Sequence, residues 1–369
     1  MMPTVLVGTR KGLFTVDDLW GPPTIVTSWF EGVPVPAVLR DPRDGAMYAA
    51  VDHGHFSGKL HRSTDKGRTW TEVATPAYPP RPDGVVDICP MTRVDRPWVT
   101  RMLWCLEAGH ADEPGVLWCG TIPGGLFRSS DRGETWELNQ ALWDDPARAE
   151  MFGGGYDEPG LHSISVDPRG PGRVTVGISC GGVWRTEDSG QTWQVGTGMK
   201  ADFMPPGRAD DPRVLDAHRI VRCPAAPDIL WAQHHNGIYR SVDDARNWSE
   251  VGPVDPSNFG FAAAVHPTDP DTAWFVPAIS DEVRIPVGGK MVVTRTRDGG
   301  RTFEKLSDGL PQERAYHLVY RHGLDVSADG RRLAMGSTTG SLWVSHDSGN
   351  RWRLVSSNLP PILAVRFIA

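Results

Sequence analysis

Short apolar segments recur along the chain, and each is followed by a turn containing glycine and then by a second, less apolar segment. Residues 116–120 (VLWCG), 174–177 (VTVG) and 229–232 (ILWA) are of the first kind, and residues 182–185 (GVWR) are of the second. Runs of this length between turn signals are typical of buried and half-buried strands. Another strand lies upstream of each pair, as at 164–168 (ISVDP). The pattern predicts antiparallel strands in successive units.

A polar motif follows the strands of each unit. Residues 125–136 (GLFRSSDRGETW) contain it, and six copies share the consensus Ser/Thr-x-Asp-x-Gly-x-Thr-Trp with single departures. The copies lie 49 to 66 residues apart, counted between Asp65, Asp131, Asp188, Asp243, Asp298 and Asp347. This period suits a four-stranded blade with long loops. We expect the motif to form the hairpin between third and fourth strands, with the aspartate accepting backbone N–H bonds and the glycine at positive φ.

A seventh unit at the amino end has strands at 5–9 (VLVGT) and 12–16 (GLFTV) but no first strand. Residues 362–367 (ILAVRF) supply it most simply, which would close the fold without a free edge. The sequence therefore predicts an all-β chain forming one seven-bladed β-propeller over 1–369, with little helix. The expected blades are 4–30 plus 361–369, 36–78, 103–140, 161–198, 217–252, 259–308 and 315–358. Three long connections, 78–102, 138–160 and 196–216, have the length of functional loops.

Composition and charge exclude several classes of function. A net charge of −7 with a pI near 5.9 gives no basic stripe, so we expect no nucleic-acid partner. The amino terminus has neither a basic region nor a long apolar run, which argues against export and against a membrane span. Five scattered cysteines without a Cys-x-x-Cys pair indicate neither disulfides nor structural zinc. These features favour the cytoplasm.

The repeated motif resembles the Asp-box, or BNR, repeat of sialidases, other glycosidase-like propellers, sortilin-type receptors and a photosystem assembly factor. Residues 233–241, 259–261, 265–267 and 281–286 also resemble a bacterial subfamily labelled BNR-repeat glycosyl hydrolases. The resemblance implies a propeller and a hydrolase-like activity, while the box itself is a structural hairpin shared by proteins of unrelated function. Arg284-Ile285-Pro286 is similar to a sialidase arginine motif, but its place in the sixth of seven predicted blades disfavours a true sialidase.

Three histidines, His162, His218 and His322, align at the start of the first strand in their blades. Converging on the central channel, neutral imidazoles at these positions could bind a divalent transition metal. Acidic residues close in sequence are candidates for partners of these imidazoles: Asp157, Glu158 and Asp216. The alternative is that each histidine is a polar side chain that fills the channel and is hydrogen-bonded inside it. His317 is the alternative to His322, because 316–320 (YHLVY) could supply that strand instead.

The loops between second and third strands, and the long connection 138–160 that carries Glu158, bring further candidates to the expected channel mouth. His235 is a candidate general base, Glu158 and Asp281 are candidate acids or nucleophiles, and Arg284 could bind a carboxylate or phosphate. Nucleotide-binding motifs are not found in the sequence. We expect a cytoplasmic hydrolase-like enzyme with a His-rich, candidate metal-binding pocket and a small polar or anionic substrate. The alternative is a non-catalytic scaffold that binds a protein or peptide on its rim, with an apolar patch and no perturbed histidines.

Overall fold

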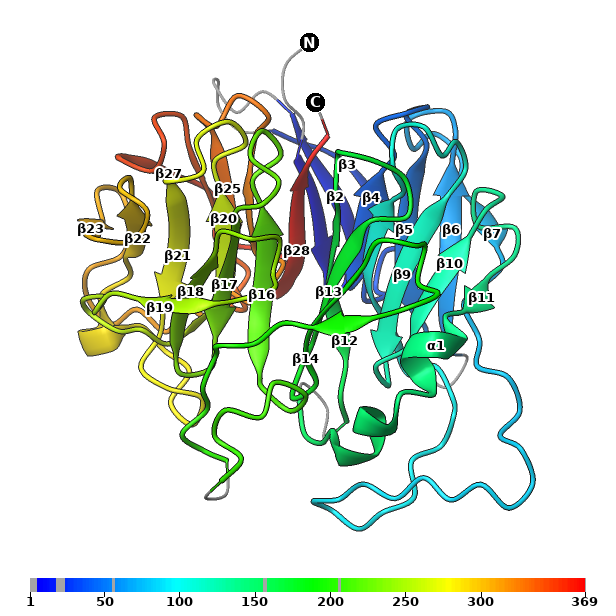
Figure 1. Ribbon diagram of the computed structural model, residues 1–369. Coiled ribbons are helices and arrows are strands. Elements are labelled where there is room, and N and C mark those ends of the chain that lie inside the picture. The colour runs from blue at the N-terminus through cyan, green and yellow to red at the C-terminus, as the bar shows by residue number, and fades with distance from the viewer. Residues whose placement is uncertain (1–4, 18–23, 55–56, 155–157, 205–206, 369) are drawn as a thin grey trace. The chain divides into compact units, whose positions relative to one another are not determined.

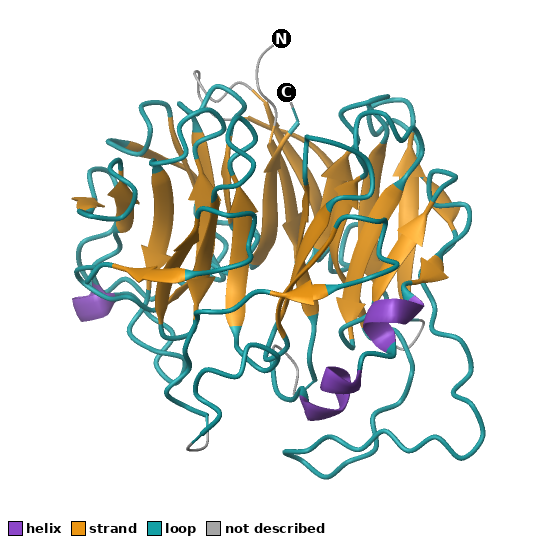
Figure 2. Cartoon of the chain, in the orientation of Figure 1, coloured by secondary structure: helices purple, strands orange, loops and turns teal. Residues whose placement is uncertain are grey.

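The computed structural model describes residues 5–17, 24–54, 57–154, 158–204 and 207–368 (Figure 1). These residues form seven four-stranded sheets, and the fold is the predicted all-β, seven-bladed β-propeller. Figure 2 shows that strands and loops make up nearly all of the described chain. Helices in the described ranges include α1 (Gln140–Trp143), η2 (Pro146–Glu150) and η3 (Val287–Gly289).

The first sheet joins the two ends of the chain. It has the order β28 (Ile362–Phe367), β1 (Val5–Thr9), β2 (Gly12–Asp17) and β3 (Thr24–Trp29). Strand β1 pairs antiparallel with β28, with Val7 opposite Val365, and this pairing closes the ring. The prediction that the carboxyl-terminal strand supplies the missing first strand is confirmed.

The remaining sheets follow the chain, each from a first strand to a fourth. The second and third are β4 (Ala37–Arg40), β5 (Met47–Asp52), β6 (Gly58–Ser63) and β7 (Thr71–Val73), then β8 (Met102–Ala108), β9 (Leu117–Ile122), β10 (Leu126–Ser129) and β11 (Glu137–Leu138). The fourth and fifth are β12 (Leu161–Val166), β13 (Val174–Ile178), β14 (Gly182–Thr186) and β15 (Gln194–Val195), then β16 (Ala217–Arg222), β17 (Leu230–His234), β18 (Gly237–Ser241) and β19 (Ser249–Val251). The last two are β20 (Gly260–Val265), β21 (Ala273–Pro277), β22 (Val293–Thr296) and β23 (Glu304–Leu306), then β24 (Leu324–Val326), β25 (Leu333–Gly336), β26 (Leu342–Ser345) and β27 (Trp352–Ser356).

Contacts divide the chain into two compact units. Unit 1 comprises Met1–Val38, Val221–Asp244 and Ser249–Ala369, and unit 2 comprises Leu39–Ile220 and Ala245–Trp248. Each unit has apolar clusters between neighbouring strands. One in unit 1 includes the buried Trp274 and Trp343, and one in unit 2 includes Trp118 and Trp184. Tryptophans on inner strands therefore provide much of the apolar surface that each unit buries.

The five cysteines are buried and free of disulfides. Within the described ranges, no helix combines the length and apolar composition that a membrane crossing requires.

The Asp boxes form hairpins between third and fourth strands, as predicted. In the box between β22 and β23, Asp298 accepts hydrogen bonds from the backbone N–H of Thr302 (2.9 Å) and from its hydroxyl (2.7 Å). The hydroxyl of Thr296 donates to Asp298 and accepts from the N–H of Gly300, at 3.0 and 2.9 Å. The same pairing of box aspartate and preceding hydroxyl occurs at Asp65, Asp131, Asp188, Asp243 and Asp347.

These hydrogen bonds make the box carboxylates sensitive to acid. Bonds from Thr302 lower the pKa of Asp298 to about 2. Because the folded-state pKa lies below the usual value near 4, the stabilising effect is complete above pH 4 and is lost as the pH falls through 2. We expect Asp298→Asn to lower the melting temperature at pH 7, and the difference from wild type to narrow between pH 4 and pH 2. A difference that stays constant over this range would contradict this interpretation.

The box glycine is required for both conformation and space. Gly300 has φ +92°, and a Cβ added there would lie 2.8 Å from Cβ of Val251 in β19. We expect Gly300→Ala to cost about 2–3 kcal/mol, because left-handed strain and crowding against a β-branched side chain add together. Gly288→Ala is the matched control, since Gly288 has φ +62° with no atom within 4 Å of the added Cβ. It should cost about 1 kcal/mol in urea denaturation, from strain alone. Equal costs for the two variants would rule out the crowding.

Candidate functional site

His162 and His218 occupy the same position in neighbouring first strands. Each is the second residue of its strand, His162 in β12 and His218 in β16, and they are 0% and 2% exposed. His322 lies two residues before β24, is partly buried, and accepts a hydrogen bond from the N–H of Val365 through its carbonyl oxygen (2.8 Å). The equivalence on which the metal prediction rests is therefore clearest for His162 and His218.

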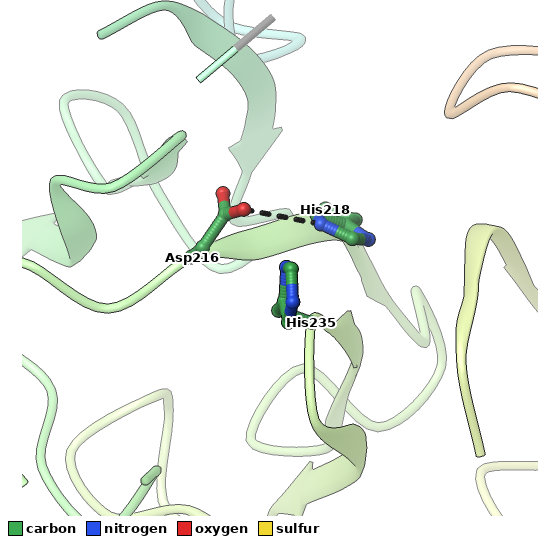
Figure 3. A group of neighbouring side chains, drawn as sticks. All are labelled: Asp216, His218 and His235. Carbon is green, nitrogen blue, oxygen red and sulfur yellow. Dashed lines mark hydrogen bonds and ion pairs between the residues drawn. The ribbon is translucent and has the colours of Figure 1, made fainter. Parts of the chain in front are cut away.

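Asp216 is the acidic partner of His218. Its Oδ2 lies 3.1 Å from Nε2 of His218, the bond marked by the dashed line in Figure 3. Its Oδ1 accepts the backbone N–H of Cys180 at 3.2 Å, so the carboxylate is held from both sides while only 7% exposed. A carboxylate on one ring nitrogen orients the imidazole and favours the tautomer whose lone pair is on the other nitrogen. That arrangement is common for metal-binding histidines.

Two other histidines are held by hydroxyl groups. In unit 2, Nδ1 of His162 lies 2.9 Å from Oγ of Ser163, and the edge of its ring meets Trp104 at 5.6 Å between centroids. In unit 1, Nδ1 of His317 lies 2.5 Å from Oγ1 of Thr339. Burial lowers the pKa of His317, so its ring is neutral at pH 7. His317 is thus a perturbed, hydrogen-bonded histidine.

Glu158, a candidate acid, belongs to unit 2 and is 7% exposed. Its Oε1 lies 3.0 Å from Nη2 of Arg101, and this ion pair favours a structural role for the carboxylate. Asp157 lies outside the described residues.

His235 and Asp281 come together in unit 1. His235, also labelled in Figure 3, lies in the turn between β17 and β18, and Asp281 lies in the connection between β21 and β22. Nε2 of His235 is 3.8 Å from Oδ2 of Asp281, and the imidazole edge meets Phe259 at 5.6 Å between centroids. The two side chains are 18% and 46% exposed, so solvent and small ligands reach the pair. A histidine beside a carboxylate can accept or donate a proton near neutral pH.

Aromatic rings and guanidinium groups continue this site. Phe261 of β20 packs against Phe259 and Tyr320, with ring centroids 5.2 and 5.5 Å apart. The guanidinium carbons of Arg284 and Arg321 lie 5.4 and 5.2 Å from its ring centroid. We call His235, Phe259, Phe261, Tyr320, Arg284 and Arg321 the Phe261 cluster. Nε of Arg284 donates to the carbonyl of Asp281 at 2.7 Å, which ties this exposed arginine to the loop that carries the acid.

Sequence reasoning identified Arg284 but did not identify Arg321 or Phe261 as site residues. Arg321 is 7% exposed and immediately precedes His322, which was singled out as a metal ligand. An arginine next to an aromatic residue in the sequence, as Arg321 is next to Tyr320, is a signal for a cation–π contact, although it does not specify which ring is met. The cluster brings positive charge and apolar rings to one place in unit 1.

Comparison with known proteins supports the fold and a distant relation to glycoside hydrolases. Residues 126–138 match the family described as BNR-Asp box repeat, so the chain carries this repeat. The chain is 25% identical over 268 residues to a probable oligoxyloglucan-reducing end-specific xyloglucanase of Neosartorya fischeri. The match covers 65% of this chain and 30% of that relative, so the chain spans less than a third of the relative's length.

Two solved structures show the same fold at low identity. An ancestral GH74 enzyme superposes with a TM-score of 0.59 at 14% identity, over 90% of this chain and 38% of that one. YCF48 bound to D1 peptide superposes with a TM-score of 0.55 at 16% identity, over 94% of this chain and 90% of that one. Identities this low support the fold alone.

Proposed function

We propose that the chain is a hydrolase-like enzyme that cleaves a carbohydrate bearing an anionic group, and that the Phe261 cluster with Asp281 is its reacting site. The contact between His235 and Asp281 carries the proposal, because it joins a proton-transfer group to a carboxylate beside two guanidinium groups. The similarity to a xyloglucanase supports a carbohydrate as the class of substrate. The two guanidinium groups support a substrate that carries a carboxylate or a phosphate, because guanidinium binds these anions well.

Each group has a distinct role in this proposal. His235 moves the proton to or from the reacting oxygen, and Asp281 stabilises the imidazolium form that results. Arg284 binds the anionic group of the substrate through its exposed guanidinium, and Phe261 holds both guanidinium groups against its ring. The exposed Glu282, next to Asp281, is available as a second carboxylate, which glycoside hydrolysis ordinarily requires.

A substrate panel tests the charge preference. We expect hydrolysis of oligosaccharides carrying a uronic acid to exceed that of neutral xyloglucan oligosaccharides. Arg284→Ala should raise KM for the acidic substrate about tenfold, because the charge-assisted hydrogen bond between Arg284 and the anionic group is lost. KM for the neutral substrate should not change. Arg284→Lys should restore part of the loss, and the exposed Arg301→Ala in an Asp box is the matched control. Equal effects on both substrates would contradict the role of Arg284.

We further propose that His162 and His218 of unit 2 bind a divalent transition metal, as the sequence predicts; His322, the third predicted ligand, belongs to unit 1. The hydrogen bond that Nε2 of His218 donates to Asp216 supports this, because it leaves Nδ1 as the ligand nitrogen of the neutral ring. Metal analysis after loading with zinc tests it. His218→Ala should abolish binding and Asp216→Asn should weaken it about 10- to 100-fold. The control is His266→Ala, since His266 lies in the turn after β20. Unchanged metal content in the His162 and His218 variants would end this proposal.

A scaffold function is favoured by one observation. The connection between β7 and β8 exposes large apolar side chains, with Val86 at 75%, Val94 at 62%, Val99 at 58% and Met91 at 55%. Apolar surface of this kind is typical of protein interfaces. If the substrate panel shows no hydrolysis, binding of a protein or peptide through this segment is the function to test next.

A further inference from the structure

Unit 2 contains a cavity that shares no residue with the Phe261 cluster. Its volume is about 490 Å³, and it is lined by the connection between β7 and β8 and by the segment that contains α1 and η2. A volume of this size is in the range of small-molecule sites. The lining residues used below are Pro79, Pro80, Trp98, Gln140, Asp144 and Arg148.

Ion pairs hold the two sides of the cavity together. Asp87, 5% exposed in the β7–β8 connection, accepts from Arg96 at 2.8 Å and from Arg148 of η2 at 2.6 Å. Burial opposes ionisation of Asp87, but the contacts with Arg148 and Arg96 outweigh it and lower its pKa. The guanidinium of Arg148 also lies 4.1 Å from the ring centroid of Trp143. The cavity is therefore formed before any ligand arrives, which reduces the entropy lost on binding.

Trp98 belongs to the same network. Its indole N–H donates to Asp87 at 2.9 Å, and its ring meets Trp143 edge to face, with centroids 5.3 Å apart and an interplanar angle of 85°. Trp143 is 3% exposed, whereas Trp98 is partly exposed. The network therefore fixes the position of Trp98, and part of its ring stays accessible to a ligand.

The two walls of the cavity differ in chemistry. Pro79 and Pro80 are exposed and present apolar rings beside Trp98. The segment that contains α1 contributes polar residues: Nε2 of Gln140 donates to Oδ2 of Asp144 at 2.6 Å, and both side chains are exposed. A sugar ring combines an apolar C–H face with hydroxyl groups along its edge. The rings of Trp98, Pro79 and Pro80 suit the apolar C–H face of a sugar. The amide of Gln140 and the carboxylate of Asp144 suit its hydroxyl groups.

We infer that this cavity binds a neutral oligosaccharide. A proline-rich peptide is the main alternative, but such ligands pack between exposed aromatic rings, and here Trp143 is buried while prolines already form a wall. The binding site is separate in its residues from the proposed reacting site and does not depend on hydrolysis. It would hold a carbohydrate chain without acting on it.

Isothermal titration of the full chain with xyloglucan heptasaccharide and with cellotetraose tests the inference. We expect saturable binding that Trp98→Ala weakens about tenfold and Gln140→Ala about fivefold. Gln140 is exposed on a short helix, so its variant stays folded even if loss of Trp98 disturbs the Asp87 network. Asp112→Ala is the control, because Asp112 is an exposed aspartate of unit 2 outside the cavity.

The outcomes separate this inference from the proposed enzyme. Binding should be the same in His235→Ala, so a failure of hydrolysis would leave it intact. No saturable binding of either sugar would overturn the inference, as would wild-type affinity in both Trp98→Ala and Gln140→Ala. Binding of a proline-rich decapeptide without binding of the sugars would also overturn it.

Discussion

Trp274→Ala is expected to lower the free energy of unfolding by about 3–5 kcal/mol, the largest effect that we expect of a single substitution on stability. Trp274 in β21 is 0% exposed and packs in the apolar cluster of unit 1 with Met335 and Trp343. Its indole N–H donates to the carbonyl of Ser348 in the last Asp box at 2.9 Å. The side chain thus joins one sheet to the hairpin of the next.

Urea denaturation followed by tryptophan fluorescence and circular dichroism measures this effect. Trp274→Phe is the matched control, because it keeps most of the buried ring and should cost about 1–2 kcal/mol through the lost hydrogen bond and the smaller side chain. A loss below 1 kcal/mol in the alanine variant would show that the packing between these sheets does not limit stability.

His235→Ala is expected to lower kcat/KM at least about 100-fold on the acidic substrate, because a positioned proton donor or acceptor typically contributes this much. His235 lies beside Asp281 and Phe259, and its removal leaves the surrounding strands β17 and β18 intact. The steady-state kinetics should show the loss in kcat rather than in KM. His266→Ala, in a turn of the same unit, should change neither.

Retention of activity in His235→Ala would place the reacting group elsewhere. The same conclusion would follow if His266→Ala lost as much activity as His235→Ala.

The fold could be predicted because its signals are local and repeated. Each Asp box is closed by hydrogen bonds within about a turn of chain, as between Asp298 and Thr302, so its residues specify a hairpin without distant partners. The apolar strands on either side then fix the unit, and the repetition of the box gives the number of sheets. The carboxyl-terminal strand β28 was found from the strand missing beside β1.

Short helices in the long connection after β11 were not predicted, although their signals are in the sequence. Asn139 caps α1 by accepting the N–H of Leu142, and Asp145 caps η2 by accepting the N–H of Ala147, with Pro146 next to it. Capping residues and proline at the first position are ordinary signs of a helix start. The strand period on either side of this connection is the stronger sequence signal, and little helix was therefore expected.

The candidate site could be predicted only in part, because it depends on how non-repeating loops fold. His235 and Asp281 were both singled out, but their contact joins residues from two different loops, which no spacing specifies. Arg321 reaches Phe261 from another segment through a cation–π contact and was missed for the same reason. The metal ligands, the cytoplasmic setting and the substrate stay predictions.

The central claim is that the Asp boxes build the fold while the chemistry belongs to the loop that carries Asp281. The most direct test compares kcat/KM at 25 °C on the uronic-acid oligosaccharide for Asp281→Asn and Asp298→Asn. We expect Asp281→Asn to lower kcat/KM about 100-fold with an unchanged melting temperature. Asp298→Asn should lower the melting temperature and leave kcat/KM unchanged. Loss of activity in Asp298→Asn together with full activity in Asp281→Asn would contradict the claim.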